Sequence, residues 1–228
     1  MRQRADLRKS LTGRIAEVFL SIQGEGPTAG MPAVFVRLQG CSVGCAWCDT
    51  RYSWDPAAGR EVALDDLVEE ASAFPCRRCV ITGGEPLESS LFAALVQALK
   101  PRGFTLEVET SGTLPPPDVV VDQWNVSVKL AGSGVPEVKR INSDAIRQFL
   151  TLGAWWKFVV VGTGDVAEVL RLAERFGIPR EKILLMPEGV RREEILERSP
   201  WVWEECKRYG FRFSPRLHIL LWGAKRGV

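Results

Sequence analysis

The stretch AVFVRLQGCSVGCAWCDT, residues 33–50, decides how the rest of the chain is interpreted. Its first six residues, Ala33 to Leu38, are apolar except for Arg37 and predict a strand. The loop that follows carries Cys41, Cys45 and Cys48 in the spacing CxxxCxxC. In parallel sheets, functional groups sit on loops at the carboxyl ends of strands. The stretch therefore predicts a strand of an α/β sheet that ends in a loop for metal or redox chemistry.

The number of ligands leaves three interpretations of this cysteine triplet open. An iron-sulfur cubane held by three thiolates keeps one iron open to an external ligand, whereas structural zinc sites are closed by four protein ligands. A zinc site would need a fourth partner, either His218 or the pair Cys76 and Cys79. In the third interpretation the cysteines are ordinary core residues. The ligand chemistry favours the open cluster.

Short β-rich runs alternate with amphipathic stretches along the chain, which is typical of parallel strands joined by crossover helices. Strands are predicted at Ile15–Leu20, Ala33–Leu38, Cys79–Thr82, Thr105–Glu109, Val126–Val128, Lys157–Val161, Ile183–Met186 and Phe211–Ser214. Helices are predicted at Leu64–Ala73, Glu88–Lys100, Asp144–Leu152, Asp165–Phe176 and Arg192–Tyr209. We expect Asp165 or Ser143 to cap a helix, and Pro200 to divide the last helix in two.

Composition and charge exclude several classes of protein. The chain has 228 residues, 46% of them apolar, and its 30 basic and 28 acidic side chains give a net charge of +2. This balance argues against a partner with a phosphate backbone, such as nucleic acid. No apolar stretch follows the charged segment 1–10, and no apolar run approaches the roughly 20 residues of a membrane helix. We expect a single domain over residues 1–228 in the cytoplasm, where clustered cysteines serve metal or redox chemistry.

A second motif, Thr82-Gly83-Gly84-Glu85-Pro86, follows a later predicted strand. Glycine lets the backbone approach a ligand closely, and the Glu85 carboxylate can accept hydrogen bonds from an amine. Together with the CxxxCxxC loop and with Trp47 before its last cysteine, this motif resembles the radical S-adenosylmethionine (SAM) superfamily. In that superfamily the amino and carboxylate groups of SAM chelate the open iron of a 4Fe-4S cluster.

The resemblance is closer to one family within this superfamily, the 7-carboxy-7-deazaguanine synthases. It runs almost continuously from Phe19 to Thr50, including FLSIQGEG at residues 19–26. It returns at Thr82–Pro86, Glu109–Thr113, Ser127–Lys129, Met186–Gly189 and, more loosely, Ser214–His218. Because these stretches span most of the chain, the resemblance implies one radical SAM catalytic domain. The fold it implies is a partial, open β/α barrel with about six core parallel strands.

This family resemblance also implies an activity. Members convert 6-carboxy-5,6,7,8-tetrahydropterin into 7-carboxy-7-deazaguanine with release of ammonia, a carbon-nitrogen lyase reaction on the pathway to queuosine and other deazapurines. The cluster would deliver one electron to SAM, and the resulting 5′-deoxyadenosyl radical would take a hydrogen atom from the pterin. The radical would regain that hydrogen after ring contraction, so SAM would be regenerated rather than consumed.

Carried over residue by residue, the resemblance implies four sets of ligands. Cys41, Cys45 and Cys48 would hold the cluster, and Thr50 would place a magnesium ion against the substrate. The substrate contacts would be Ile22, Gln23, Gly24, Glu25, Arg37 and Thr110, with His218 and Val228 as further candidates. The SAM contacts would be Trp47, Cys48, Asp49, Gly84, Glu85, Gly112, Ser127, Val128, Lys129, Met186, Pro187, Glu188 and Gly189.

Several of these residues also have simpler interpretations. Gln23 and Glu25 offer donors and acceptors to the edge of a pterin, but they also suit a polar turn. Arg37 can bind the substrate carboxylate through its guanidinium fork or form a structural ion pair. The cation of Lys129 can meet the SAM carboxylate or be solvated. His218, the only histidine, can be a ligand or a hydrogen-bonded structural residue.

The chain departs from the family pattern in two places, and other functions compete with the synthase. Val128 stands where many relatives have proline, and the chain extends beyond the point at which some members end on a residue that touches the substrate.

A glycyl-radical activase also carries CxxxCxxC, and a zinc-binding interaction module would use the triplet with Cys76, Cys79 or His218. For the synthase, the expected partners are an electron donor such as flavodoxin or ferredoxin and a second copy of the chain in a homodimer.

Overall fold

The computed structural model describes residues 11–228, so segment 1–10 and what was predicted from it lie outside the described residues. These residues form a nine-stranded sheet in the order β3-β1-β2-β4-β5-β6-β7-β8-β9. The strands are β1 (Thr12–Ile22), β2 (Pro32–Leu38), β3 (Arg60–Ala63), β4 (Arg78–Gly83), β5 (Thr105–Thr110), β6 (Gln123–Val126), β7 (Trp155–Val160), β8 (Ile183–Pro187) and β9 (Arg212–Phe213). The helices are α2 (Leu64–Ser72), α3 (Phe92–Leu99), α4 (Glu137–Arg140), α5 (Ser143–Thr151), α6 (Thr163–Phe176), α7 (Arg192–Tyr209) and α8 (Leu217–Trp222).

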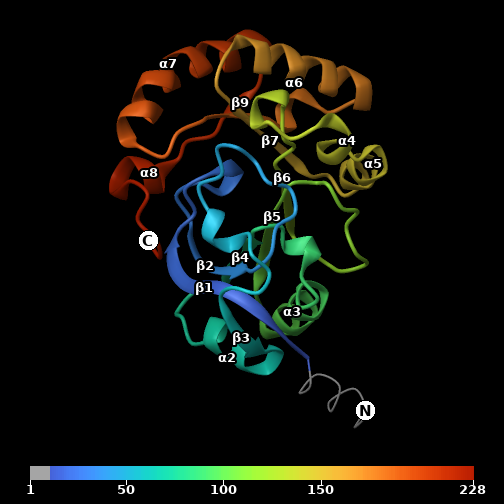
Figure 1. Ribbon diagram of the computed structural model, residues 1–228, viewed down its shortest axis with the longest axis vertical. Helices are drawn as coiled ribbons and strands as arrows, with labels where there is room; N and C mark the ends of the chain where they lie inside the picture. Colours follow the sequence, from blue (N-terminus) through green and yellow to red (C-terminus); the bar gives the residue numbers. More distant parts are fainter. Residues whose placement is uncertain (1–10) are drawn as a thin grey trace.

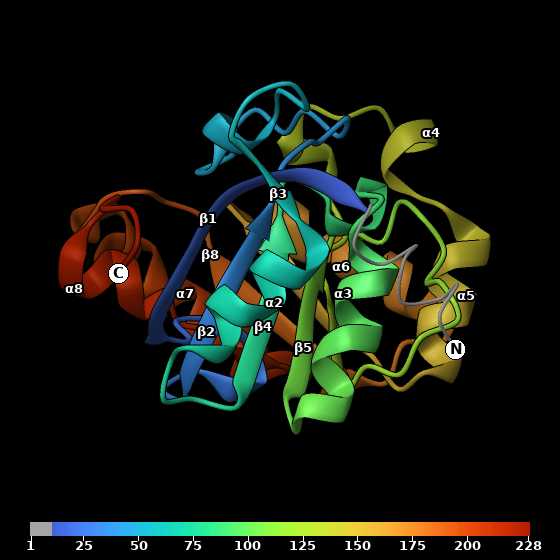
Figure 2. The same cartoon turned by 90° about the horizontal axis from the view of Figure 1, so that it is seen from below.

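In the sheet order β2-β4-β5-β6-β7-β8-β9, each strand is parallel to the next. Strand β1 is antiparallel to both of its neighbours, β2 and β3. The sheet curves, and helices α2, α3, α5, α6 and α7 follow its outer side (Figures 1 and 2). Its two edge strands, β3 and β9, do not pair with each other. The expected partial, open β/α barrel is therefore confirmed, and its core strands are parallel as predicted.

The core lies between this sheet and the helices around it. Trp156 on β7 and Phe92 on α3 are among its largest fully buried side chains. Trp124 packs between Phe92 and Phe149, with ring centroids 6.0 and 5.2 Å away. Burying a large apolar side chain contributes about 1.5–3 kcal/mol. The apolar runs that predicted the strands thus become the layer that supports the polar end of the barrel.

The structure corrects several expectations about individual elements. Helix α7 continues through Pro200. Proline has no backbone N–H, so the carbonyl of Leu196, four residues earlier, has no hydrogen-bond donor within the helix. Leu196 is exposed, and its carbonyl can bind water instead. Asn142, not Ser143, caps α5, where its side chain accepts hydrogen bonds from two backbone N–H groups. Helix α6 begins two residues before Asp165, which instead accepts a hydrogen bond from the backbone of Val161.

Other differences concern the element boundaries. Strand β6 ends at Val126, three residues after it starts, so it lies N-terminal to the predicted Val126–Val128. Strand β3 and helices α4 and α8 were not predicted, because with four, four and six residues they are too short for a clear periodic pattern. None of the helices in residues 11–228 combines the length and the apolar character that crossing a membrane requires.

Candidate active site

One large pocket opens at the carboxyl ends of the parallel strands, where the fold predicts functional groups. It is bounded by β1, β2, the cysteine loop, the ends of β4 to β8, and the C-terminal segment that follows β9. Most of the residues predicted from the sequence line it. They are Ile22, Gln23, Gly24, Glu25, Arg37, Cys41, Cys45, Trp47, Cys48, Asp49, Thr50, Gly84, Thr110, Ser127, Lys129, Met186, Glu188, His218 and Val228.

Five predicted SAM contacts are absent from the pocket lining: Glu85, Gly112, Val128, Pro187 and Gly189. Glu85 is 1% exposed. Its carboxylate accepts hydrogen bonds from the Thr110 hydroxyl at 2.7 Å and from the backbone N–H and hydroxyl of Ser111 at 2.7 and 2.5 Å. Such a carboxylate ties the end of β4 to the end of β5 and supports the pocket wall from behind.

The cysteine loop is anchored by backbone and side-chain contacts on both sides. The Cys41 backbone N–H donates to the Trp54 carbonyl at 3.1 Å, and the Trp54 indole N–H lies 3.2 Å from the Cys48 sulfur. Glu88 accepts from the Ser42 hydroxyl at 2.6 Å and from its backbone N–H. The loop is therefore anchored to Trp54 on one side and to Glu88 on the other.

These thiols suit an iron-sulfur cluster better than one zinc ion. Zinc bonds to sulfur at about 2.3 Å, which puts tetrahedral thiolates about 3.8 Å apart. Within residues 11–228, no group of three ligands that includes a cysteine has all its ligand atoms within 4.8 Å of one another. A cubane binds each thiolate to a different iron and so spreads its ligands more widely. Burial raises the pKa of the Cys41 and Cys45 thiols, so their thiolates need a partner that stabilises the negative charge, as a metal ion would.

The proposed fourth zinc ligands lie elsewhere. The Cys76 sulfhydryl donates to the carbonyl of Pro32, the first residue of β2, whereas the triplet follows the last residue of that strand. Cys79 is fully buried and pairs in register with Val34. Seven residues of strand span about 23 Å. The zinc site built from the triplet and this pair is therefore excluded by geometry, and His218 lies beside Glu25 instead.

The two glycines of the second motif pack against the cysteine loop. A methyl group at Gly83 would collide with the backbone carbonyl of Leu38, and one at Gly84 with that of Gly40. The Gly84 methyl would also lie 2.6 Å from the Cβ of Cys41. The Glu85 backbone N–H donates to the Gly40 carbonyl at 2.9 Å. The motif thus holds Cys41 at the end of β2, in addition to bordering the pocket.

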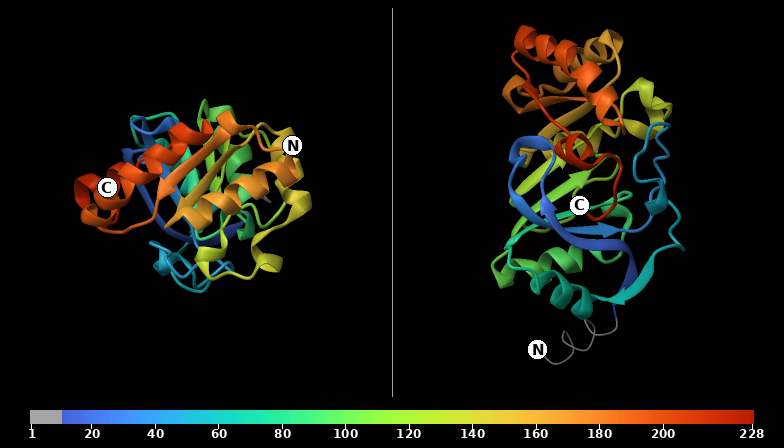
Figure 3. Two further views of the ribbon diagram at one scale, coloured as in Figure 1. Left: turned by 90° about the horizontal axis from the view of Figure 1, so that it is seen from above. Right: turned by 90° about the vertical axis from the view of Figure 1, so that its left-hand side faces the viewer.

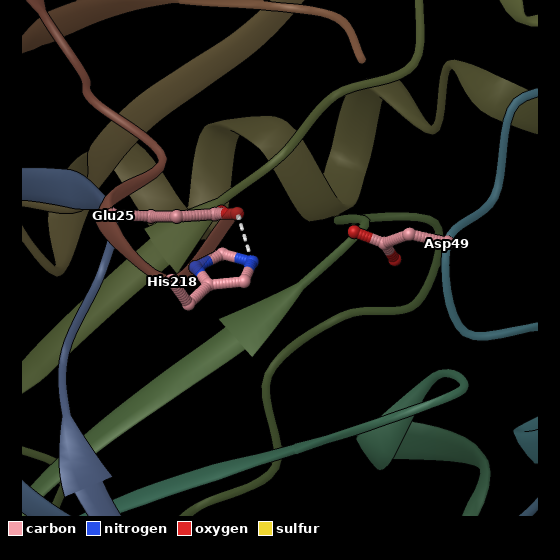
Figure 4. Close-up of side chains that lie close together, drawn as sticks. All are labelled: Glu25, Asp49 and His218. Atoms are coloured by element: carbon pink, nitrogen blue, oxygen red, sulfur yellow. Dashed lines mark ion pairs between the residues drawn. The ribbon is translucent and has the colours of Figure 1, made fainter. Parts of the chain in front are cut away.

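A group of buried charges surrounds Glu25, which follows β1. The Glu25 carboxylate accepts from Lys157 Nζ at 2.7 Å and from Arg216 Nε at 3.1 Å, and His218 Nε2 lies 3.8 Å away. Figure 4 shows His218 beside Glu25, with Asp49 reaching toward them from the cysteine loop. Burial opposes ionisation of Glu25, but these cations outweigh it and hold its pKa well below the ordinary value.

Glu25, Asp49 and His218 are close enough to share a metal ion, since one ligand atom from each lies within 4.8 Å of the others. A guanidinium already occupies the centre of this arrangement. Arg216 Nε binds Glu25, and Arg216 Nη2 binds Asp49. Burial lowers the pKa of His218, which leaves its imidazole uncharged at neutral pH. The carboxylates of this trio are therefore neutralised by arginine and lysine.

Polar groups beneath Glu25 continue this network into the barrel. Glu107 on β5 has no exposed surface and accepts from Thr28, Gln23 and Asn125 at 2.7, 2.8 and 2.6 Å. The Gln23 side-chain carbonyl accepts from the backbone N–H of Glu25 at 3.2 Å. Gln23, which is 3% exposed, is thus held by the barrel interior and in turn supports the loop that carries Glu25.

Sequence reasoning missed most of these interior partners: Glu107, Glu109, Asn125, Lys157 and Arg216. The available signal was a charged residue within an apolar strand, as in WWKFVV at 155–160 and TLEVET at 105–110. Arg37 was recognised by that criterion. Its Nε binds Glu17 at 2.8 Å, and it lines the pocket at the same time, so it has both a structural partner and access to the site.

Comparisons with known proteins agree with this geometry. Residues 35–136 match the model of the radical SAM superfamily, and the fold and cysteine loop define the same class of enzyme. A 7-carboxy-7-deazaguanine synthase of Pyrobaculum aerophilum is 43% identical over 94% of this chain and 96% of its own length. That of Hyperthermus butylicus is 39% identical over 91% of this chain and 92% of its own. The crystal structure of QueE from Escherichia coli superposes with a TM-score of 0.75 at 28% identity, covering 95% of this chain and 99% of that one. The chain belongs to the 7-carboxy-7-deazaguanine synthase family.

Proposed function

We propose that this chain, as a single catalytic domain over residues 1–228, forms 7-carboxy-7-deazaguanine from 6-carboxy-5,6,7,8-tetrahydropterin and releases ammonia. Family membership over nearly the whole length is the observation that carries this proposal. The pocket supports it, because it combines three cysteines with a charged group suited to a polar bicyclic substrate. The reaction serves the synthesis of queuosine or a related deazapurine.

In this proposal Cys41, Cys45 and Cys48, which all line the pocket, would hold the 4Fe-4S cluster. When bound, the cluster supplies the electron that cleaves SAM and so starts the radical reaction. Trp54 donates to the Cys48 sulfur and places it, and Lys129 lowers the pKa of the Cys45 thiol against the effect of burial. Lys129 Nζ is held by the carbonyl and hydroxyl of Ser127 at 2.9 and 3.0 Å, which leaves its third hydrogen free for the SAM carboxylate.

The remaining SAM contacts divide into groups that face the cofactor and groups that support them. Trp47, Asp49, Gly84, Ser127, Met186 and Glu188 line the pocket and are proposed to contact SAM directly. Glu85, Gly112, Val128, Pro187 and Gly189 are proposed to shape the same wall. For Glu85 this role is supported by its hydrogen bonds to Thr110 and Ser111, which leave little of its carboxylate for a ligand.

The proposed pterin site lies on the side of the pocket formed by β1, β2 and β5. Glu25 offers an ionised carboxylate to the donors of the pterin edge, and Ile22, Gln23 and Gly24 form the adjoining wall. Arg37 offers its guanidinium to the substrate carboxylate, and Thr110, His218 and Val228 border the same space. Thr50 is proposed to bring one hydroxyl oxygen to a magnesium ion that is otherwise held by water and substrate.

The reductant, the oligomeric state and the compartment belong to the proposal as well. We propose a flavodoxin or ferredoxin as electron donor and the cytoplasm as location, where the six free thiols stay reduced. A homodimer is supported by the apolar groove that Leu20, Ile22 and Trp222 form at the C-terminal end of β1. Sedimentation at the mass of one 25.4 kDa chain would contradict the dimer.

Anaerobic turnover tests the proposed function. Cluster-loaded protein is incubated with the carboxypterin, SAM, magnesium and dithionite, and the deazapurine is measured by mass spectrometry. We expect product from the wild type and none from Cys45→Ala, which lacks one cluster ligand. Cys206→Ala is the matched control, because Cys206 lies on the buried face of α7 and its sulfhydryl donates to the backbone carbonyl of Arg212, and this variant should retain activity. Wild-type protein with four irons per chain that yields no product would refute the proposal.

A further inference from the structure

The Glu25 carboxylate is held through both of its oxygens. Lys157 Nζ lies 2.7 Å from Oε2, and Arg216 Nε lies 3.1 Å from Oε1. The side chains of Lys157 and Arg216 are each 6% exposed, whereas that of Glu25 is 16% exposed and borders the pocket. With one cation on each oxygen, the plane of the carboxylate is fixed, and the carboxylate retains lone pairs that can accept from a ligand in the pocket.

Lys157 connects Glu25 to the rigid wall of the barrel. It projects from β7 and binds Glu109 Oε2 at 2.6 Å, and the other oxygen of Glu109 accepts from Asn125 at 2.9 Å. Glu109 belongs to β5 and Asn125 to the neighbouring β6. Glu25, by contrast, lies in the loop after β1, which has no strand partner of its own. Three strands thus determine where this loop carboxylate stands.

We propose that Lys157 is the positioning residue for pterin recognition, because it fixes both the direction and the negative charge of Glu25. The inference rests on the proposed function, in which Glu25 accepts hydrogen bonds from the pterin, and it adds a residue that the pterin itself does not need to touch. Arg216 holds the second oxygen but is shared with Asp49 on the cysteine loop. Lys157 has no partner on that loop, and its effect is therefore specific to the pterin side of the pocket.

The charges that face Glu25 determine the sign of the expected pH effect. Lys157 approaches from β7, Arg216 and His218 from the C-terminal segment, Glu109 from β5 and Asp49 from the cysteine loop. Burial raises the pKa of Glu25, and the three basic groups lower it. Without Lys157, the effects of burial and of the two acidic groups are opposed by one cation fewer, so the pKa of Glu25 rises. As the pH is lowered, Glu25 is then protonated earlier, and pterin binding that needs its ionised form is lost at a higher pH than in the wild type.

The test measures pterin binding separately from the radical chemistry. Binding of the carboxypterin to cluster-loaded, SAM-bound protein is followed by tryptophan fluorescence without reductant, in Lys157→Met, Lys157→Arg and the control Lys139→Met. Lys139 is exposed and does not line the pocket. Loss of a charge-assisted contact predicts a rise of about tenfold or more in Kd for Lys157→Met. In separate anaerobic turnover with dithionite, its KM should rise by a similar factor, with a change in kcat of less than about threefold. Lys157→Arg should recover most of the affinity, and Lys139→Met should match the wild type.

A double variant separates the loss of positioning from a loss of folding. Lys157→Met leaves the buried carboxylate of Glu109 without its cation, which can destabilise the fold. Lys157→Met/Glu109→Gln removes both charges and keeps the hydrogen bond to Asn125. We expect this variant to fold with the wild-type circular dichroism spectrum and iron content, and still to bind pterin about tenfold more weakly with its acid limb at higher pH. Wild-type affinity in the folded double variant, or equal losses in Lys157→Met and Lys157→Arg, would overturn the positioning role. Failure of the wild type to bind the pterin would instead refute the proposed function.

Discussion

At the residue scale, Gly84 shows how a motif recognised from chemistry can also be required by packing. The sequence suggested that its missing side chain allows close approach to a ligand. In the structure, the space of that side chain is filled by the Gly40 carbonyl and the Cβ of Cys41. Gly84 borders the pocket as well. The two roles are compatible, because a backbone that packs tightly on the cysteine loop also presents a bare surface beside it.

This packing predicts the effect of Gly84→Ala. The added methyl collides with backbone, which cannot move aside as a flexible side chain would, so the cysteine loop must shift at Cys41. We expect loss of most bound iron after anaerobic reconstitution, measured as iron and sulfide per chain. Gly164→Ala is the matched control, since a methyl there meets nothing within 4 Å, and its iron content should be unchanged. Full iron loading of Gly84→Ala would show that this contact does not hold the loop.

The sequence pointed to the three clustered cysteines but not to the partners that make the charged site stable. Spacing alone reveals Cys41, Cys45 and Cys48, because they lie within eight residues. Lys157 and Glu25 are 132 positions apart, and only the fold brings them together. What the sequence does contain is the anomaly of a lysine in the apolar strand WWKFVV, which predicts an ion pair without naming its partner.

At the element scale, α8 and the loop after β1 close the open side of the barrel. The Leu217 backbone N–H donates to the Gly24 carbonyl at 3.0 Å, and a methyl at Gly24 would collide with the His218 ring. Figure 3 shows this C-terminal segment lying across the strands on the side of β1. The helix has only six residues, so its pattern in the sequence is too short to identify it, although Ile219–Trp222 stands out as an apolar run.

Gly24→Ala tests whether this contact holds α8 against the site. The methyl would lie 3.1 Å from the His218 backbone nitrogen as well as against its ring, so the first turn of α8 must move. We expect faster amide hydrogen exchange in residues 217–222 and a KM for the carboxypterin raised by about tenfold. The control is Gly162→Ala, where a methyl meets nothing within 4 Å. Unchanged exchange in α8 would contradict the contact.

Prediction of elements succeeded where a strand is buried on both faces and failed where pairing is set by tertiary structure. The apolar runs at 79–82, 105–109 and 157–161 all became parallel strands. β3 has only four residues and exists because it pairs with the first part of β1, which a sequence pattern does not reveal. Helix α7 shows the opposite error, since Pro200 predicted a break that the long exposed helix tolerates.

At the scale of the whole molecule, the buried charges link stability to pH. Burial opposes ionisation of Glu25, but Lys157, Arg216 and His218 lower its pKa far below the ordinary 4.5. At pH values between the ordinary pKa, which applies to the unfolded chain, and the lower pKa of the folded state, Glu25 binds more protons in the unfolded chain than in the folded one. The free energy of unfolding therefore decreases as the pH falls. The stabilisation from Glu25 is complete above about pH 5 and declines below it, by up to about 1.4 kcal/mol per pH unit.

Glu25→Gln should remove this contribution. We expect its free energy of unfolding, measured by urea denaturation, to be lower than that of the wild type at pH 7, and the two values to converge as the pH falls from about 5 to about 3. Glu109, whose pKa burial raises, acts with the opposite sign but is present in both proteins. Curves that stay parallel over this range would show that Glu25 is not held ionised by its cations.

The fold and the position of the cysteine loop could be predicted from the sequence because both depend on local sequence patterns. The triplet follows β2 directly, and the alternation of strands and helices fixes where that loop opens. The six cysteines divide accordingly: Cys76 and Cys79 lie at the other end of the strands, and Cys206 lies on the buried face of α7. The barrel's open side, which α8 and the charge network complete, depends on contacts across nearly the full chain.

The most direct test of the central claim is the ratio of product formed to SAM consumed during anaerobic turnover. Both are measured in one reaction by mass spectrometry, with methionine and 5′-deoxyadenosine counted as consumed SAM. A synthase that returns the hydrogen atom to its cofactor predicts many molecules of 7-carboxy-7-deazaguanine for each SAM lost. One SAM consumed per event, or SAM cleavage without any deazapurine, would contradict the account and favour an enzyme that spends its cofactor, such as a glycyl-radical activase.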